Sequence, residues 1–281
     1  MAFRTARNLA YFSNYIRNYS TNGPLVNVTV NEKSGFATAT LQRPSVNSLN
    51  LELLTEISHT LQQLEKNKCR GLILTSASNK VFSAGLDLFE LHKPNADKIK
   101  QMWSTLQEVW IKLYGSSYPT VAVVNGHAPA GGCMLALSCE YRVMLNNFII
   151  GLNEAQIGFS APMWLIDGMR NTIGSRQAEF ALTAGTLFKT EEALKIGLVD
   201  EVAQSKEEAI EKAEKFLNKF AKIPPHARSM TKAALRGANI QALVRNKDEE
   251  VRSYVDFVTD SQFQDSLGEF IELNLKQKLS K

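Results

Sequence analysis

The sequence lacks the short motifs that identify several large enzyme classes. Its 281 residues contain no GxSxG nucleophile elbow, GxGxxG dinucleotide loop, P-loop or HExxH zinc motif, so the chemistries that depend on them lose their usual sequence support. Cysteine is scarce as well. Cys69, Cys133 and Cys139 are odd in number and lack the paired spacing of a zinc site. They fit buried thiols in a reducing compartment, and we predict no metal site and no cofactor.

Charge is absent from residues 113–139. An uncharged stretch of this length is long enough to raise the question of a membrane span. It contains Pro119, Asn125, His127, Pro129 and four glycines, so a helix through it would be broken and polar. We therefore expect no membrane span.

Acidic residues are absent from the first 31 positions, which carry Arg4, Arg7 and Arg17 together with several hydroxyl and apolar side chains. This composition predicts a mitochondrial transit peptide over residues 1–23, and a disordered or docking N-terminal arm is the alternative. Without those arginines, 29 of the 32 basic residues remain against 28 acidic ones. The near-neutral balance of about +1 gives little support for nucleic-acid binding.

What the chain does contain is a pattern of strands followed by helices. Alternating residues at 25–30 and 36–41 predict a β-hairpin, and Asn50 can cap a helix over 51–64. Ile223-Pro-Pro breaks the chain after the helical pattern at 206–220 and suggests a boundary. The remaining predictions are strands at 71–74, 121–124 and 141–145, and helices at 95–114, 133–139, 163–170, 175–183, 190–195 and, as two or three helices, within 226–278.

Two strand–glycine–helix junctions stand out, one near Gly85 and one near Gly131. Each can direct a backbone N–H into a shared cleft where an anion would bind. Further along, Glu154 is the only carboxylate between Glu140 and Asp167. A carboxylate in such an apolar neighbourhood tends to have a raised pKa and to move protons. Taken singly, these features also fit glycines that permit close packing and a solvated loop carboxylate.

In combination these motifs resemble the crotonase (enoyl-CoA hydratase/isomerase) superfamily, and more narrowly its mitochondrial Δ3,Δ2-enoyl-CoA isomerases. The resemblance covers roughly residues 25–275. The segments that carry it are Asn47-Ser-Leu49, Phe82-Ser-Ala-Gly-Leu-Asp-Leu88, Asn125-Gly-His-Ala-Pro-Ala-Gly-Gly-Cys133, Gly151-Leu-Asn-Glu154, Asn171-Thr-Ile-Gly174, Gly197-Leu-Val-Asp-Glu201 and Ile223-Pro-Pro-His-Ala-Arg228.

The resemblance implies an α/β fold, a crotonase-like spiral of ββα units with a C-terminal helical region. It divides the chain into the leader, a core at 24–222 and an oligomerising helical region at 223–281. The implied oxyanion hole is formed by the backbone N–H groups of Leu86 and Gly131, and Glu154 is the implied catalytic base. The residues implied to bind substrate are Ala84, Gly85, Leu86, Asp87, Leu88 and Asn153.

One departure from the family pattern bears on the reaction. Hydratases of the family have a second glutamate in the helix after the glycine pair, where this chain has Met134. Hydration needs two proton-handling groups, whereas a 1,3-shift of a double bond needs one. We therefore expect isomerisation of 3-enoyl-CoA to trans-2-enoyl-CoA in β-oxidation. The resemblance implies a homotrimer, and the leader predicts that it lies in the mitochondrial matrix. A hydratase, a dienoyl-CoA isomerase using Asp97 or Glu108, and a non-catalytic acyl-CoA- or RNA-binding member are the alternatives.

Three further expectations concern single residues. Asp87 is expected to cap the helix that follows it, and His127 to be a loop residue without a catalytic role. The apolar residues after Glu154 line the acyl tunnel or simply pack in the core; they are Ile157, Phe159, Met163 and Trp164.

Overall fold

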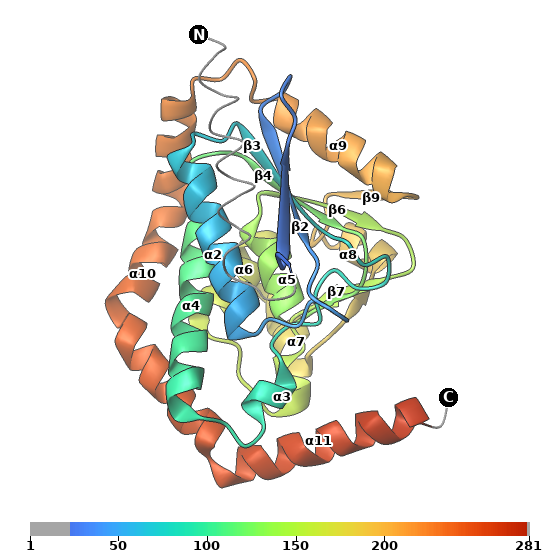
Figure 1. The fold of residues 1–281 in the computed structure, drawn as a ribbon, viewed down its shortest axis with the longest axis vertical. Helices are drawn as coiled ribbons and strands as arrows, with labels where there is room; N and C mark the ends of the chain where they lie inside the picture. The colour runs from blue at the N-terminus through green and yellow to red at the C-terminus, as the bar shows by residue number, and fades with distance from the viewer. Residues whose placement is uncertain (1–22, 280–281) are drawn as a thin grey trace.

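The computed structural model describes residues 23–279, with side chains as far as Glu272. Apart from Gly23, the predicted transit peptide lies outside the described residues. The chain begins with the expected hairpin, in which β1 (Val26–Val30) pairs antiparallel with β2 (Phe36–Leu41). The first described strand therefore forms one edge of the main sheet (Figure 1).

The main sheet has the order β1-β2-β3-β4-β6-β9, and every pair after the hairpin is parallel. The carboxyl ends of its parallel strands consequently lie at one edge, where ligands of open α/β sheets bind. A second sheet has the order β5-β7-β8. The further strands are β3 (Gly71–Ser76), β4 (Thr120–Val124), β5 (Ala128–Pro129), β6 (Tyr141–Leu145), β7 (Ile149–Gly151), β8 (Phe188–Lys189) and β9 (Glu201–Ala203).

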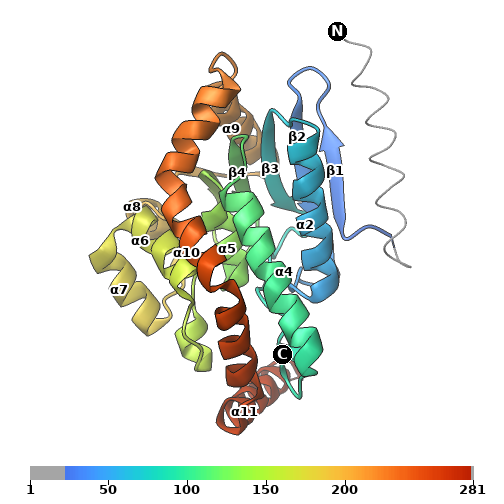
Figure 2. The same cartoon turned by 90° about the vertical axis from the view of Figure 1, so that its left-hand side faces the viewer.

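Helices cover both faces of the main sheet (Figures 1 and 2). Since side chains alternate along a strand, β4 faces two layers. Val121 and Val123 pack with the apolar face of α9, while Ala122 and Val124 belong to the larger core on the other face. The helices of these two layers are α2 (Leu51–Lys66), α4 (Ala96–Tyr114), α5 (Gly131–Ser138) and α9 (Lys206–Asn218).

The remaining helices lie outside the α4–α5 layer. Two helices, α10 and α11, fill the C-terminal region, and α10 packs along α4 (Figure 1). Leu243, Val251 and Val258 join the same core as the sheet. These elements are α3 (Leu88–Leu91), the 3₁₀ turn η2 (Glu154–Ile157), α6 (Met163–Ile173), α7 (Ser175–Ala184), α8 (Thr190–Lys195), α10 (Pro225–Thr259) and α11 (Ser261–Leu279).

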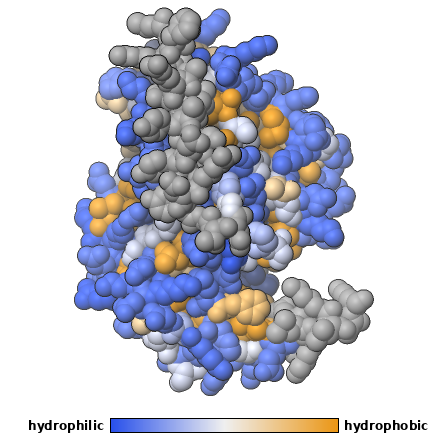
Figure 3. Space-filling model, in the orientation of Figure 1, coloured by the Kyte–Doolittle hydropathy of each residue, from blue (hydrophilic) through white to orange (hydrophobic). Residues whose placement is uncertain are grey.

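Most sequence-based boundaries agree with the structure. Asn50 caps α2, its side chain accepting from the N–H of Leu53. The segment that returns the chain at 197–201 contains a turn, and its strand, β9, begins only at Glu201. The face seen in Figure 3 is mainly hydrophilic with scattered apolar patches. Within the described part of the chain, no helix is long and apolar enough to cross a bilayer.

Candidate functional site

Two loops leave neighbouring parallel strands at the carboxyl edge of the main sheet, and a buried asparagine joins them. Asn125, directly after β4, donates from Nδ2 to the carbonyls of Ser76 at 3.0 Å and Ser78 at 2.7 Å. Its Oδ1 accepts from the N–H of Ser76 at 3.1 Å. Because Ser76 ends β3, these bonds hold the starts of both loops in fixed relative positions. The two strand–glycine–helix junctions predicted from sequence are therefore adjacent.

The two glycines of these junctions are in direct contact. Gly85 has φ +83°, and a Cβ added there would lie 3.1 Å from the backbone nitrogen of Gly131. A Cβ added at Gly131 would lie 3.2 Å from the Cα of Gly85. Only glycine permits both the left-handed backbone and this approach.

Within the described part of the chain, the N–H groups of Leu86 and Gly131 have no backbone hydrogen-bond partner. Neighbouring groups are engaged: Leu49 N–H donates to Gly85 C=O at 2.7 Å, and Ala130 N–H to Gly151 C=O at 2.8 Å. Among residues 23–279, neither the Leu86 nor the Gly131 N–H donates to another backbone carbonyl. Buried N–H groups are nearly always paired in proteins. This pair is thus suited to receive an oxygen of a ligand.

An ion pair between Asp87 and Arg43 stabilises the loop that carries Leu86. Asp87 accepts from the N–H of Phe89 and so caps α3, as predicted. Its other oxygen lies 2.9 Å from Nη2 of Arg43, whose Nη1 donates to the carbonyl of Ser48. The Asp87 side chain therefore stabilises the loop, and these contacts indicate a structural role rather than a catalytic one.

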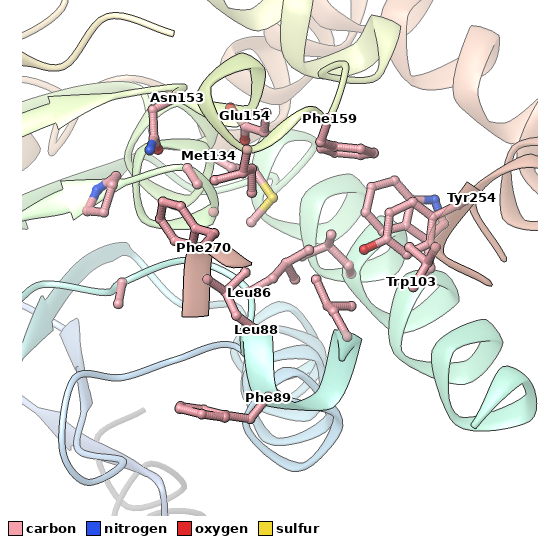
Figure 4. Close-up of a pocket in the computed structure, with 18 of the residues that line it drawn as sticks. Leu86, Leu88, Phe89, Trp103, Met134, Asn153, Glu154, Phe159, Tyr254 and Phe270 are labelled. Carbon is pink, nitrogen blue, oxygen red and sulfur yellow. The ribbon is translucent and has the colours of Figure 1, made fainter. Parts of the chain in front are cut away.

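A cavity of about 420 Å³ opens beside the two glycine junctions. Its lining is mainly apolar, and Asn153 and Glu154 contribute polar side chains on one side (Figure 4). Residues of α4, α10 and α11 complete the walls. The lining residues are Val46, Ala84, Leu86, Leu88, Phe89, Leu91, Trp103, Leu106, Pro129, Ala130, Gly131, Met134, Asn153, Glu154, Ile157, Phe159, Leu165, Tyr254, Val258, Phe263, Phe270 and Ile271.

Glu154 begins the 3₁₀ turn η2 and is only 6% exposed. Burial raises the pKa of its carboxyl from an ordinary 4.5 to about 7, an effect that its own backbone N–H only partly offsets. Its Oε2 is buried and has no hydrogen-bond partner among the described residues. A carboxyl with that pKa can both accept and return a proton near neutral pH.

The structure brings most of the sequence-predicted site residues to this one cavity. Ala84, Leu86, Leu88, Gly131, Asn153 and Glu154 all line it, whereas Gly85 and Asp87 support the loop from behind.

Two of the four residues considered for the acyl tunnel line the cavity, and the other two do not. Ile157 and Phe159 line the cavity, but Met163 is 59% exposed, and Trp164 is buried behind the lining. Met163 is the first residue of α6, where its side chain faces outward, so the expectation for it is wrong.

Several wall residues were missed because they come from the C-terminal helices. Tyr254 and Val258 reach the cavity from α10, and Phe263 and Phe270 from α11. Apolar residues at 251, 254 and 258 follow helical spacing. That pattern was the available signal, but it indicates only a buried helix face and not which cavity the face borders.

The other carboxylates considered from sequence lie elsewhere. Asp97 and Glu108 are both exposed on α4, and Glu108 faces Lys112 and Lys247. The buried side chain of Met134 lines the cavity. Among the described lining residues, Glu154 is the only one that carries a carboxylate.

His127 lies outside the cavity lining. Its Nδ1 accepts from the N–H of Ile149, and its ring packs edge-on against Phe148. These contacts give it a structural place in the loop after β4.

Comparison with known proteins gives a consistent result. The sequence model of the family Enoyl-CoA hydratase/isomerase matches residues 31–278. Enoyl-CoA delta isomerase 1, mitochondrial, of Mus musculus is 44% identical over 248 residues, which cover 87% of this chain and 85% of the relative. A short-chain-enoyl-CoA hydratase of Clostridium acetobutylicum is 29% identical, covering 75% of this chain and 81% of that protein.

The fold agrees with solved structures. The crystal structure of human mitochondrial delta3-delta2-enoyl-CoA isomerase superposes with a TM-score of 0.87 at 42% identity, covering 90% of this chain and 99% of that one. The expected crotonase-like α/β architecture with C-terminal helices is thereby confirmed. The chain belongs to the enoyl-CoA hydratase/isomerase family.

Proposed function

We propose that this protein is a Δ3,Δ2-enoyl-CoA isomerase that converts cis- or trans-3-enoyl-CoA to trans-2-enoyl-CoA in the β-oxidation of unsaturated fatty acids. The observation that carries the proposal is the cavity itself. It combines one buried carboxyl, Glu154, with two unpartnered N–H groups, those of Leu86 and Gly131. Relatives named as isomerases at 43–44% identity support the same reaction.

The thioester carbonyl oxygen would lie between the N–H groups of Leu86 and Gly131. Removal of a C2 proton moves negative charge onto that oxygen and forms a dienolate. Preorganised donors in a dry site stabilise such charge by about 3 kcal/mol each. Ala84, Leu88 and Asn153 line the same cavity and would contact the acyl thioester and its pantetheine.

Glu154 would act as the single proton shuttle. As a carboxylate it takes the proton from C2, becomes neutral, and returns the proton at C4, while the double bond moves from C3–C4 to C2–C3. Burial that raises the pKa to about 7 makes both the acceptance and the return of the proton feasible. The reaction only relocates a proton, so it requires no cofactor.

The alternatives within the family need a second acid in the cavity. Hydration requires one group to activate water and another to manage the second proton, and Met134 cannot serve as either. The candidates for a dienoyl shift, Asp97 and Glu108, are exposed on α4. These placements favour the single-carboxylate reaction.

The test is an assay of the purified protein with 3-enoyl- and 2-enoyl-CoA thioesters in parallel. Conversion of the 3-enoyl substrate without appreciable hydration of the 2-enoyl substrate is expected. Hydration at a comparable rate would overturn the proposal. Absence of both reactions, with acyl-CoA still bound, would favour a binding protein instead, and salt-sensitive retention of RNA on a filter would favour the RNA-binding alternative.

We further propose that residues 1–23 direct the chain to the mitochondrial matrix, that 24–222 form the catalytic core and that 223–281 support a homotrimer. Large apolar side chains are exposed on α10, including Leu235 at 77% and Met230 at 59%. Burial of such residues between subunits would remove them from water. Light scattering of the protein without residues 1–23 would measure the subunit number, and a monomer would contradict the assembly.

A further inference from the structure

Three aromatic side chains that line one side of the cavity pack together; they are Trp103, Phe159 and Tyr254, and we call them the aromatic wall. Trp103 and Tyr254 stack with ring centroids 3.5 Å apart and planes at 11°. Phe159 meets Trp103 edge-on at 6.0 Å and Tyr254 at 5.6 Å. Figure 4 shows this group across the cavity from Asn153.

A polar layer lies directly behind the wall. Glu250 precedes Tyr254 by four residues on α10, and Gln107 follows Trp103 by four residues on α4, so each pair shares a helix face. The carboxyl of Glu250 accepts from Nε2 of Gln107 at 2.5 Å. The antiparallel helices α4 and α10 therefore meet in two successive contacts, one aromatic and facing the cavity, one polar and behind it.

A third helix joins the same carboxyl. The indole Nε1 of Trp164, on α6, lies 3.0 Å from both oxygens of Glu250. Trp164 is 3% exposed and contacts Trp103 with ring centroids 6.2 Å apart. The next residue, Leu165, lines the cavity. One side chain thus connects α4, α6 and α10 immediately behind the aromatic wall.

Glu250 is unusual because its partners are neutral. Across the described residues, no ion pair includes it, and the nearby Lys247 pairs with Glu108 instead. Burial raises the pKa of Glu250, opposed by the N–H donors of Gln107 and Trp164. A partly buried carboxyl without a cation costs stability unless it is well hydrogen-bonded. Its hydrogen bonds connect α10 to Gln107 of α4 and Trp164 of α6.

We propose that Glu250 is a positioning residue for substrate specificity: by tying α4, α6 and α10 together it fixes the aromatic wall, and the wall sets how long an acyl chain the cavity accepts. This inference rests on the proposed function, because it assigns the side of the cavity formed by the aromatic wall to the acyl chain. Glu250 itself does not line the cavity.

The test compares Glu250→Leu, Glu250→Gln and Glu249→Leu with the wild type. Leucine leaves the Trp164 and Gln107 donors unpaired. Glutamine keeps an acceptor for the Trp164 indole and should restore wild-type behaviour. Glu249 is exposed on the same helix, so Glu249→Leu makes the same substitution at a position that does not contact Gln107 or Trp164. Trp164→Phe removes the indole donor but keeps an aromatic ring, and it decides the question should Glu250→Leu fail to fold.

Dissociation constants are measured for the saturated thioesters hexanoyl-, octanoyl-, decanoyl-, dodecanoyl- and tetradecanoyl-CoA, which bind without reacting. Each additional buried methylene contributes about fourfold to affinity. In the wild type, affinity should stop increasing at the acyl-chain length that reaches the aromatic wall. In Glu250→Leu, affinity should keep increasing for longer chains. The ratio of the affinity for tetradecanoyl-CoA to that for hexanoyl-CoA should therefore be at least about fourfold higher in the variant than in the wild type.

The outcome that overturns the inference is a length profile in Glu250→Leu and Trp164→Phe that runs parallel to the wild-type profile, even if all affinities fall. A purely structural role predicts that parallel loss. Because saturated thioesters are not turned over, the result is independent of isomerase activity. A wild-type protein that binds them but does not isomerise 3-enoyl-CoA would refute the proposed function while leaving the role of the wall to be decided by the binding data.

Discussion

Replacement of Glu154 by glutamine should lower the rate of isomerisation and raise the free energy of unfolding. Glutamine matches the size of glutamate but cannot accept and return a proton. General acid–base catalysis contributes about 10²–10⁴-fold, or roughly 3–5 kcal/mol of activation free energy. Acyl-CoA binding should persist, because the Leu86 and Gly131 donors and the apolar walls are unchanged. The isomerase rate should therefore fall by that factor with little change in the affinity for saturated thioesters.

The effect on stability follows from the raised pKa of Glu154. In the unfolded chain the carboxyl titrates near 4.5, and in the folded protein near 7. Between these values the folded state binds more protons, so rising pH destabilises the wild type through this window. The total contribution is on the order of 3 kcal/mol, and most of it accrues between pH 5 and 8. The Glu154→Gln variant, which lacks this titration, should gain about 2–3 kcal/mol over the wild type across the same range.

Urea unfolding at pH 5 and pH 8, combined with the 3-enoyl-CoA assay, measures both effects. The matched control is Glu179→Gln, the same substitution at an exposed position on α7, which should change neither quantity. In the wild type, kcat/KM should also decline as pH falls through about 7, because the base must be ionised. The reasoning fails if the variant keeps more than about a tenth of wild-type activity, or if its stability difference from the wild type is equal at both pH values.

Three further changes test other parts of the site and fold. Gly85→Ala should lower kcat by about 10²–10³-fold, the loss expected when one oxyanion donor is displaced, whereas Gly174→Ala, at φ +80° with no atom within 4 Å of the added Cβ, should cost stability alone. Met134→Glu should introduce measurable 2-enoyl-CoA hydration, and Met134→Gln should not; equal hydration by both variants would contradict the requirement for a second acid. Glu56→Ala, which removes the carboxyl accepting from the N–H groups of Leu25 and Val26 at the start of β1, both at 2.9 Å, should lower the free energy of unfolding by about 1–3 kcal/mol in urea, and an equal loss in exposed Gln62→Ala would refute that assignment.

Local patterns were sufficient to predict most of the fold. Alternation gave the β1–β2 hairpin, and helical spacing with a capping asparagine gave α2, because these signals arise from neighbouring residues. The strands β5, β7 and β8 were missed. With two or three residues each, they are too short to show a period, and they exist only because the loops around the site are brought together.

Part of the candidate site could likewise be predicted from local sequence patterns, and part could not. Leu86, Gly131 and Glu154 follow recognisable motifs, and the structure places all three at one cavity. The side of the cavity formed by the aromatic wall depends on contacts between α4 and α10. One of them joins Gln107 and Glu250, two residues that are 143 positions apart in the sequence. Neither residue has a distinctive local pattern. Their pairing follows from how α10 packs along α4, which no short window of sequence contains.

The effects of the single carboxylate, Glu154, and of the buried Met134 beside it in the cavity lining are linked (Figure 4). A second ionised carboxylate at position 134 would lie beside Glu154 in the lining of the same cavity (Figure 4), and like charges at close range raise one pKa further. Met134 instead adds apolar surface, which keeps the local dielectric low and so strengthens the donors of Leu86 and Gly131 toward a developing oxyanion. The residue that removes the means of hydration therefore also favours the dienolate through which the double bond moves.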